Sequence, residues 1–314
     1  MRHAIDQLGL KGSVLVVKNS RPWLKYATAN KPDTSYLINS VQKSMTATMV
    51  MRAVQNHKLK LSTKLSEFYP EVAGADQVTV ANLLNMTSGL DLRKGEKLGT
   101  DVYISDEDNF KSDVEKTVFN PKMLGKWHYT SVNYVYLCGI LSKIENKSYE
   151  EMFRATYIKP LKLKHTEFLW ANIPQLKASG WVPSYRYRDG RYKRVKHERA
   201  VKDARDELGA GSIVMSDGDL AKTLHAILAG NLLTQKSRSI LFTGKAPSYY
   251  NGGLYNTHQF KKANGAGEGY FTFLRTTNDA KYMIIIQSNR TNHDRFNSLK
   301  SQISGIMSLL LTLE

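Results

Sequence analysis

A serine and a lysine stand three residues apart where an apolar segment runs into a helical pattern. The segment covers Tyr36 to Val54 and reads YLINSVQKSMTATMVMRAV. Ser40 takes the N-cap or first-turn position of the expected helix. The Ser40 and Lys43 side chains therefore project from one face of that helix. A serine hydroxyl becomes a nucleophile when a nearby base takes its proton, and a lysine amine can be that base. The N–H groups at the helix start can stabilise an oxyanion.

The same spacing also fits a capped and solvated helix start, so the surrounding elements must decide between the two interpretations. Strand patterns lie at both ends of the chain, at 12–18, 23–29, 269–275 and 281–288, and the first two predict a hairpin. Helical patterns fill the middle and close the chain, at 40–54, 79–88, 129–145, 148–163, 216–233 and 296–311. Thr79 and Ser216 are the expected caps of two of these helices.

This order of elements predicts an α/β (α+β) fold. An antiparallel sheet is built from both termini and flanked by helices, and a mostly helical domain is inserted into it. The expected boundaries are 1–39 plus 206–314 for the discontinuous α/β sheet domain and 40–205 for the inserted domain. A basic surface excursion is expected near 180–205.

Composition restricts the partners and the compartment. The chain has 314 residues, 41% of them hydrophobic, and a formal charge of +17. The hydrophobic fraction is enough for a core of ordinary size. The positive charge predicts an anionic partner, which can be nucleic acid, a phospholipid surface or an acidic wall polymer. Cys138 is the single cysteine, so no intrachain disulfide forms, and this fits a cytosolic protein as well as a secreted one. No apolar run predicts a transmembrane segment or a signal peptide, so an exported protein would need an export segment that this chain lacks.

Five separated segments together resemble one known family. They read INSVQKSMTA, TVANLLNMTSGL, YTSVNYVYLCGILSKI, GAGSIVMSDGDLAKTL and GAGEGYFTFL. In order and spacing they are similar to the serine β-lactamase-like, or penicillin-binding-protein, family, which includes class C β-lactamases, D-alanyl-D-alanine carboxypeptidases and related esterases. The resemblance covers nearly the whole chain and implies a β-lactamase/transpeptidase-like fold.

The resemblance also implies acyl transfer. Ser40 would attack a carbonyl, Lys43 would take its proton, and Tyr129 would pass a proton to the leaving group. The backbone N–H groups of Ser40 and Ala266 would form the oxyanion hole. The same alignment places Ser131, Asn264, Gly265 and Ala266 at the substrate. Without this context, Tyr129 reads as a half-buried tyrosine at a helix start.

Two motif positions depart from the family pattern. The second motif usually runs Tyr-x-Asn, but Ser131 stands at the amide position and offers only a hydroxyl. The third motif usually begins with Lys or His, but Ala263 stands there, so the cation that would hold a substrate carboxylate is missing. Lys261 or Lys262 could replace that cation, and strand alternation puts Lys261 on the same face as Ala263.

These departures favour substrates without a free carboxylate. A β-lactam or a terminal D-alanine would lose its ionic partner, whereas an ester would lose less. A D-alanyl ester of teichoic acid is one such substrate, because its carboxyl is esterified and its phosphate backbone would be drawn to a basic protein.

The segment Tyr185 to Arg199 interleaves Arg and Lys with Tyr. It is interpreted as a solvated surface excursion, or as a contact for an anionic wall polymer such as teichoic acid. Nucleic-acid binding by phosphate contacts and stacking is the least favoured alternative. The eight histidines show no metal-site spacing and no glycine loop is suited to a phosphate, so no cofactor or metal is expected.

The sequence therefore predicts a serine hydrolase that works through an acyl-Ser40 intermediate on a cell-envelope D-alanyl ester or D-alanyl peptide. The alternative is a catalytically weak or inactive homologue that binds an anionic envelope polymer. The resemblance implies an extracellular or cell-surface location, with the cytoplasm left open.

Overall fold

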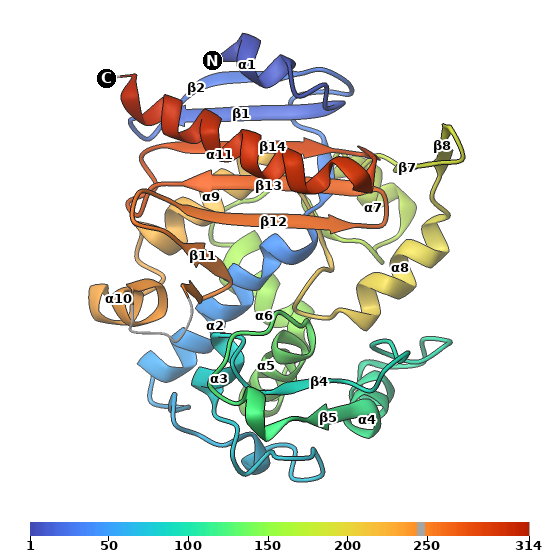
Figure 1. Ribbon diagram of the computed structural model, residues 1–314, viewed down its shortest axis with the longest axis vertical. Coiled ribbons are helices and arrows are strands. Elements are labelled where there is room, and N and C mark those ends of the chain that lie inside the picture. The colour runs from blue at the N-terminus through green and yellow to red at the C-terminus, as the bar shows by residue number, and fades with distance from the viewer. Residues whose placement is uncertain (244–248, 314) are drawn as a thin grey trace.

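The computed structural model describes residues 1–243 and 249–313. Its largest element is a seven-stranded antiparallel sheet with the order β10-β11-β12-β13-β14-β1-β2 (Figure 1). The strands are β1 (Gly12–Lys18), β2 (Arg21–Ala27), β10 (Tyr250–Asn251), β11 (Leu254–Asn256), β12 (Lys261–Gly267), β13 (Tyr270–Thr276) and β14 (Met283–Ser288). Because β14 pairs with β1, the two ends of the chain meet inside one sheet, and the predicted fold class is confirmed.

The first hairpin turns more tightly than predicted. Asn19 and Ser20 both have positive φ, 52° and 63°, as the two central residues of a short hairpin turn require. The second strand therefore begins at Arg21, two residues before the predicted start, and includes Pro22. Pro22 is tolerated because β2 lies at the edge of the sheet.

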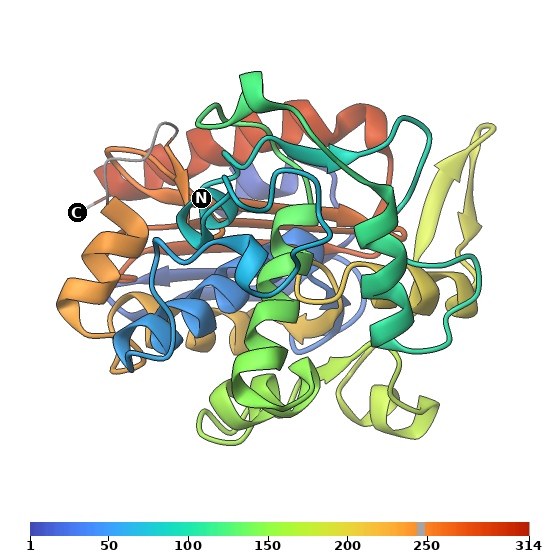
Figure 2. The same ribbon diagram turned by 90° about the horizontal axis from the view of Figure 1, so that it is seen from below.

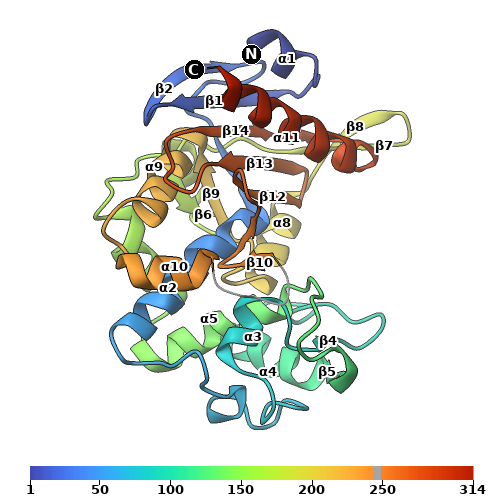
Figure 3. The same ribbon diagram turned by 60° about the vertical axis from the view of Figure 1, so that its left-hand side comes forward.

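Helices cover both faces of the sheet. α11 (Phe296–Thr312) and α1 (Arg2–Asp6) lie on one face, and α9 (Asp217–Leu228) lies on the other (Figure 3). Strand alternation supplies both cores: Val14 and Val16 pack in the cluster with α11, whereas Leu15 and Val17 pack in the cluster with α9.

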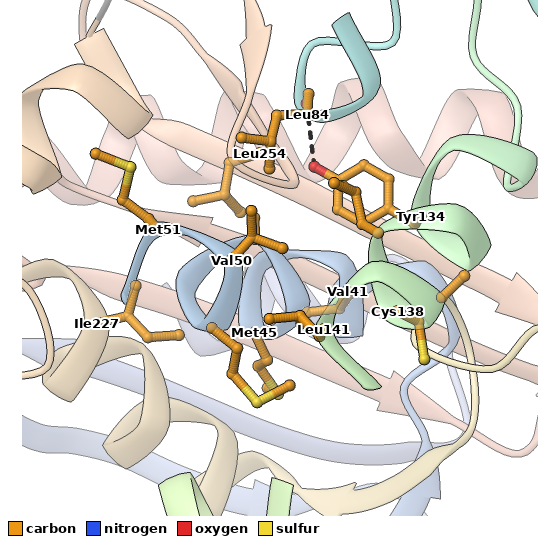
Figure 4. Close-up of a cluster of buried hydrophobic side chains, with 14 of the residues drawn as sticks. Val41, Met45, Val50, Met51, Leu84, Tyr134, Cys138, Leu141, Ile227 and Leu254 are labelled. Atoms are coloured by element: carbon orange, nitrogen blue, oxygen red, sulfur yellow. Dashed lines mark hydrogen bonds between the residues drawn. The ribbon is translucent and has the colours of Figure 1, made fainter. Parts of the chain in front are cut away.

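The helical region lies below the sheet in Figure 1. Its helices are α2 (Lys43–Gln55), α3 (Val80–Leu84), α4 (Asp106–Lys116), α5 (Val132–Glu145) and α6 (Tyr149–Phe153), which continues as a π-helical turn (Arg154–Ile158). Figure 4 shows α2 at the centre of the core, where Met45 and Val50 pack with Leu141 of α5 and Ile227 of α9. α2 is therefore buried between the helical region and the sheet.

Smaller elements complete the chain. They are β3 (Ser35–Leu37) with β9 (Ile213–Ser216) and β6 (Thr166–Phe168), β4 (Leu90–Leu92) with β5 (Thr117–Phe119), β15 (Arg290–Thr291) with β7 (Tyr185–Arg188) and β8 (Arg191–Arg194), and α7 (Ile173–Ala178), α8 (His197–Asp206) and α10 (Gln235–Thr243). β7 and β8 form a hairpin that projects from the body, as Figure 2 shows. The domain boundaries given above stay a prediction. Within the described ranges no helix combines the length and the apolar character needed to cross a bilayer.

Local signals set the helix starts better than the helix ends. Thr79 accepts a hydrogen bond from the Asn82 N–H, and Ser216 accepts one from the Asp219 N–H, so both predicted caps are confirmed. α3 nevertheless ends at Leu84, before the predicted stop near residue 88. The reason is Met86, whose φ of 57° cannot continue a helix.

Asp217 makes the stability of the fold depend on pH. The side chain is fully buried in the first turn of α9, and this burial raises the pKa of its carboxyl to about 7, although Ser13 and Lys25 oppose the shift. An unfolded aspartate releases its proton near pH 4. The stabilising contribution of protonated Asp217 is therefore complete below about pH 4 and is lost as the pH rises through about 7.

Asp217→Asn keeps the shape of the side chain and removes its charge. We expect the difference in the free energy of unfolding between this variant and the wild type to grow in favour of the variant by roughly 2 kcal/mol from pH 5 to pH 8. Urea unfolding at the two pH values measures the gain, with Asp101→Asn at an exposed position as the control. The same difference between variant and wild type at both pH values would contradict the assignment.

Candidate active site

The predicted nucleophile lies on a short turn that leads into α2. A 3₁₀ turn covers Asn39–Gln42, and α2 begins directly afterwards at Lys43, so Ser40 occupies the first-turn position that the sequence indicates. The Lys43 amine is 3.0 Å from Ser40 Oγ and 3.4 Å from the Ala210 carbonyl oxygen. Lys43 is fully buried, and within the described ranges no carboxylate forms an ion pair with it. Its amine is thus directed at the serine hydroxyl.

Tyr129 joins this pair from a distant part of the chain. It lies three residues before α5, and the Lys43 amine is 5.2 Å from the centroid of its ring. Tyr250 of β10 packs edge-on against the same ring at 5.7 Å. The structure therefore brings together the hydroxyl, the amine and the tyrosine that the sequence singled out. Their roles as nucleophile, base and proton carrier stay predictions.

β12 lies so close to the nucleophile turn that two of its positions have no room for a side chain. A Cβ on Gly265 would lie 2.0 Å from the Ile38 carbonyl oxygen, and one on Gly267 would lie 2.6 Å from Asn39 Oδ1. Asn39 has a φ of 48° and donates to the Gly267 carbonyl at 3.3 Å. Gly265 thus acts through its missing side chain, which lets the strand reach the residue before Ser40.

Ala266 and Ser131 both line a cleft beside this turn. In the described part of the chain, β11 pairs with β12 only at Lys261 and Lys262, so the following residues of β12 have one free backbone edge. That edge agrees with the predicted backbone role of Ala266 in an oxyanion hole, which stays a prediction. Ser131 precedes α5, and its hydroxyl caps no backbone N–H of that helix.

The Asn264 side chain does not face the cleft, contrary to its predicted contact with substrate. Its Oδ1 accepts a hydrogen bond from the Arg275 guanidinium at 3.0 Å. Arg275 in turn donates to Ser304 Oγ at 2.9 Å, on the face covered by α11. Strand alternation explains the difference, because Asn264 lies between two residues that face the nucleophile turn.

Neither nearby lysine replaces the missing cation at Ala263. Lys261 shares the face of Ala263 as predicted, but its amine donates to Asn256 Oδ1 at 2.6 Å and to the Phe242 carbonyl at 3.3 Å. Burial lowers the pKa of this amine to about 8. Lys262 lies over the Tyr255 ring at 5.9 Å. Both lysines line a separate pocket with Tyr249 and do not line the cleft that contains Ser131 and Ala266.

Two supports of the site were missed by sequence reasoning. Gln42 is fully buried, and its Oε1 accepts hydrogen bonds from the N–H groups of Ser212 and Ile213. Gly253 turns β10 into β11 with a φ of 77°, and a Cβ there would lie 2.2 Å from the Ser44 nitrogen. The pair Gly252 and Gly253 between strand-forming residues was a readable hairpin signal. No sequence signal distinguishes the buried glutamine.

The cleft beside Ser40 has a volume of about 440 Å³. Asn39, Ser131 and Ala266 line the part nearest the nucleophile. Four carboxylates line the same cleft, and they belong to Asp203, Asp206, Glu207 and Glu268. Lys97 and Arg199 are the cations of the lining, so the lining is acidic although the chain as a whole is strongly basic.

A model of the β-lactamase family matches residues 2–303. The chain belongs to the β-lactamase family. The family match, together with a curated relative named as a hydrolase, identifies the protein as a serine hydrolase. The chain is 25% identical over 313 residues to a putative penicillin-binding protein, PbpX, of Bacillus subtilis (strain 168), with 97% of this chain and 77% of the relative covered. It is 26% identical over 269 residues to a teichoic acid D-alanine hydrolase of Staphylococcus aureus (strain NCTC 8325 / PS 47), covering 83% of this chain and 63% of that relative, less than two thirds of its length.

Solved structures share the fold. The structure of FmtA from Staphylococcus aureus superposes with a TM-score of 0.82 at 22% identity, covering 99% of this chain and 86% of that one. A D-amino acid amidase from Ochrobactrum anthropi SV3, complexed with L-phenylalanine, gives a TM-score of 0.81 at 17% identity, covering 99% of both chains. At these identities the likeness shows the fold alone.

Gly265→Ala tests the contact between β12 and the nucleophile turn. The new Cβ must displace the strand from Ile38, and a shift of about 1 Å at a catalytic centre lowers activity about 100-fold. We expect that loss in kcat/KM for a p-nitrophenyl ester, with the fold retained by circular dichroism. Gly305→Ala in α11 is the matched control, because its Cβ meets open space. Full activity in Gly265→Ala would contradict the close contact.

Proposed function

We propose that this protein hydrolyses D-alanyl esters of a teichoic-acid-like envelope polymer through an acyl-Ser40 intermediate. One observation carries the proposal: the Ser40 and Lys43 pair is in place, while Ala263 stands at the motif position of the carboxylate-binding cation and the amines of Lys261 and Lys262 are held elsewhere. A D-alanyl ester has no free carboxylate, so it loses nothing from this absence. A D-alanyl peptide with a terminal carboxylate would lose an ionic contact.

The proposed reaction has two steps. Lys43 takes the proton of Ser40, whose oxygen attacks the ester carbonyl, and N–H groups of Ser40 and Ala266 hold the resulting oxyanion. When the oxyanion collapses, the bond to the polymer hydroxyl breaks, and Tyr129 passes a proton to that leaving oxygen. Water then attacks the D-alanyl-Ser40 ester in the same way, which releases D-alanine and restores the serine.

Two further observations support this substrate. The relatives include a protein named teichoic acid D-alanine hydrolase, and a structural neighbour is named D-amino acid amidase. The hairpin of β7 and β8 carries the exposed cations Arg188, Arg191 and Arg194, and Arg186 at its base pairs with Glu268 of the cleft. A polymer bound along this hairpin would thus lie beside Ser40, and we place that encounter outside the cytoplasmic membrane.

Ser40→Ala tests the enzyme activity directly. We expect the wild type to release D-alanine from D-alanylated teichoic acid and to be labelled at Ser40 by a fluorophosphonate. Ser40→Ala should retain less than about a thousandth of that rate and should not be labelled, because the nucleophile is gone. Ser301→Ala at an exposed position of α11 is the matched control. Equal release by Ser40→Ala and wild type would remove the proposed mechanism.

The replaced motif residues Ser131 and Ala263 favour a second candidate, a protein that keeps the cleft for binding only. This candidate predicts salt-sensitive association with anionic polymer and no D-alanine release by the wild type. Release that depends on Ser40 argues against it.

The hairpin is tested by the triple change Arg188→Gln, Arg191→Gln and Arg194→Gln. Within the described residues these side chains form no ion pairs, so the fold should persist. We expect the apparent KM for D-alanylated polymer to rise about tenfold near 0.15 M salt, since three screened contacts to phosphate are lost. The kcat/KM for a small D-alanyl ester should stay unchanged. An unchanged KM for the polymer would show that the hairpin does not bind it.

A further inference from the structure

The loop that follows α8 connects the acidic lining of the cleft to the catalytic lysine. The Glu207 carbonyl accepts hydrogen bonds from the N–H groups of Ala210 and Gly211, which curls the loop back on itself. The Ala210 carbonyl faces the Lys43 amine at 3.4 Å. The next residue but one, Ser212, donates its N–H to Gln42. The position of Glu207 is therefore fixed relative to Ser40 by backbone contacts.

The Glu207 carboxylate lies beside the nucleophile turn without a counter-ion. A Cβ on Gly211 would lie 3.1 Å from Glu207 Oε2 and 3.5 Å from the Asn39 Cα, so the carboxylate and the residue before Ser40 border the same point. Within the described chain no cation pairs with Glu207, whereas Asp203 and Asp206 on the same helix each face a basic side chain. This leaves one half-buried anionic group in the cleft wall with its charge unanswered.

Glu268 adds a second carboxylate from the turn between β12 and β13. It is 6% exposed and lines the cleft, and its Oε1 pairs with Arg186. Its Oε2 is buried, has no hydrogen-bond donor among the described residues, and forms an ion pair with Arg199 Nε at 3.9 Å, while Asp203 is a neighbouring carboxyl group. Glu268 also holds a φ of 44° in the turn between β12 and β13, a conformation that suits Gly or Asn better. Strain of this kind persists where the side chain has a use.

We propose that Glu207 and Glu268 form a subsite that binds the α-ammonium group of the substrate, so that the enzyme acts on amino-acid esters or amides whose amine is free. This inference rests on the proposed function and adds the group that selects the acyl part. The family's usual carboxylate-binding cation is replaced by Ala263, and a carboxylate without a counter-ion lines the cleft beside the nucleophile turn. The site is thus arranged for a cationic acyl group and against an anionic one.

A pair of small substrates tests the subsite. D-alanine methyl ester carries the ammonium group, and N-acetyl-D-alanine methyl ester lacks it. We expect the wild type to favour the free amine by about 10- to 100-fold in kcat/KM, as a charge-assisted hydrogen bond allows. Glu207→Gln should bring the ratio close to one, because kcat/KM for the free amine falls once the charge that binds the ammonium group is removed. Glu268→Gln should lower the ratio less, because Arg186 already shares that carboxylate.

Glu198→Gln is the matched control, because it removes the same charge from an exposed position in the first turn of α8. It should leave the ratio at the wild-type value. A ratio that Glu207→Gln does not change, or a wild type that prefers the acetylated ester, would overturn the subsite and leave the proposed hydrolase intact.

Binding measurements distinguish a failure of the subsite from a failure of the proposed function. If the wild type hydrolyses neither ester, the proposed function fails, and titration of Ser40→Ala with D-alaninamide and N-acetyl-D-alaninamide then decides the subsite alone. Preferential binding of D-alaninamide, abolished by adding Glu207→Gln, supports it. Equal binding of the two amides overturns it.

Discussion

The site depends on the absence of side chains where β12 meets the nucleophile turn. Gly265 and Gly267 approach Ile38 and Asn39 so closely that a single methyl group at either position would overlap them. A strand from the C-terminal part of the chain is thereby held against a turn near its beginning. The contact at Gly265 is with the Ile38 backbone, which sets distances more tightly than side-chain packing because it has few torsions through which to relax, whereas Gly267 faces the Asn39 side chain.

The other walls of the site are built on this contact. Asn39 is held in a left-handed conformation and bonds back to Gly267, and Gln42 fixes the next part of the turn to Ser212 and Ile213. Gly253 presses the β10–β11 turn onto the start of α2. Ser40 and Lys43 therefore gain their 3.0 Å separation from three backbone segments rather than from helix geometry alone.

Much of the fold was readable because its signals are local. The run of β-forming residues at 12–18 matches β1 residue for residue, and the closing helix differs from its predicted range by one residue. Ser40 and Lys43 were identified because their spacing is a helical spacing. Tyr129 needed the family resemblance, since nothing within its own segment places it near the lysine.

The rest could not be predicted because it depends on contacts made in three dimensions. The direction of the Asn264 side chain is decided by the register of β12 against β13 and by the buried Arg275. Lys261 lies on the predicted face, yet Asn256 and Phe242 draw its amine away from the cleft. The proximity of Glu207 to Ser40 comes from a loop that folds back after α8, and its composition gives no sign of that path.

The charge of the cleft opposes the charge of the whole protein, and this has a consequence for a polyanion at its surface. The net charge of +17 attracts phosphate at long range, out to a Debye length of about 8 Å at physiological salt. The carboxylates that line the cleft would repel the same phosphate. For the proposed polymer substrate, this charge arrangement would keep the main chain outside the cleft and admit a pendant group, so a branch would be selected over a backbone linkage before any bond is broken.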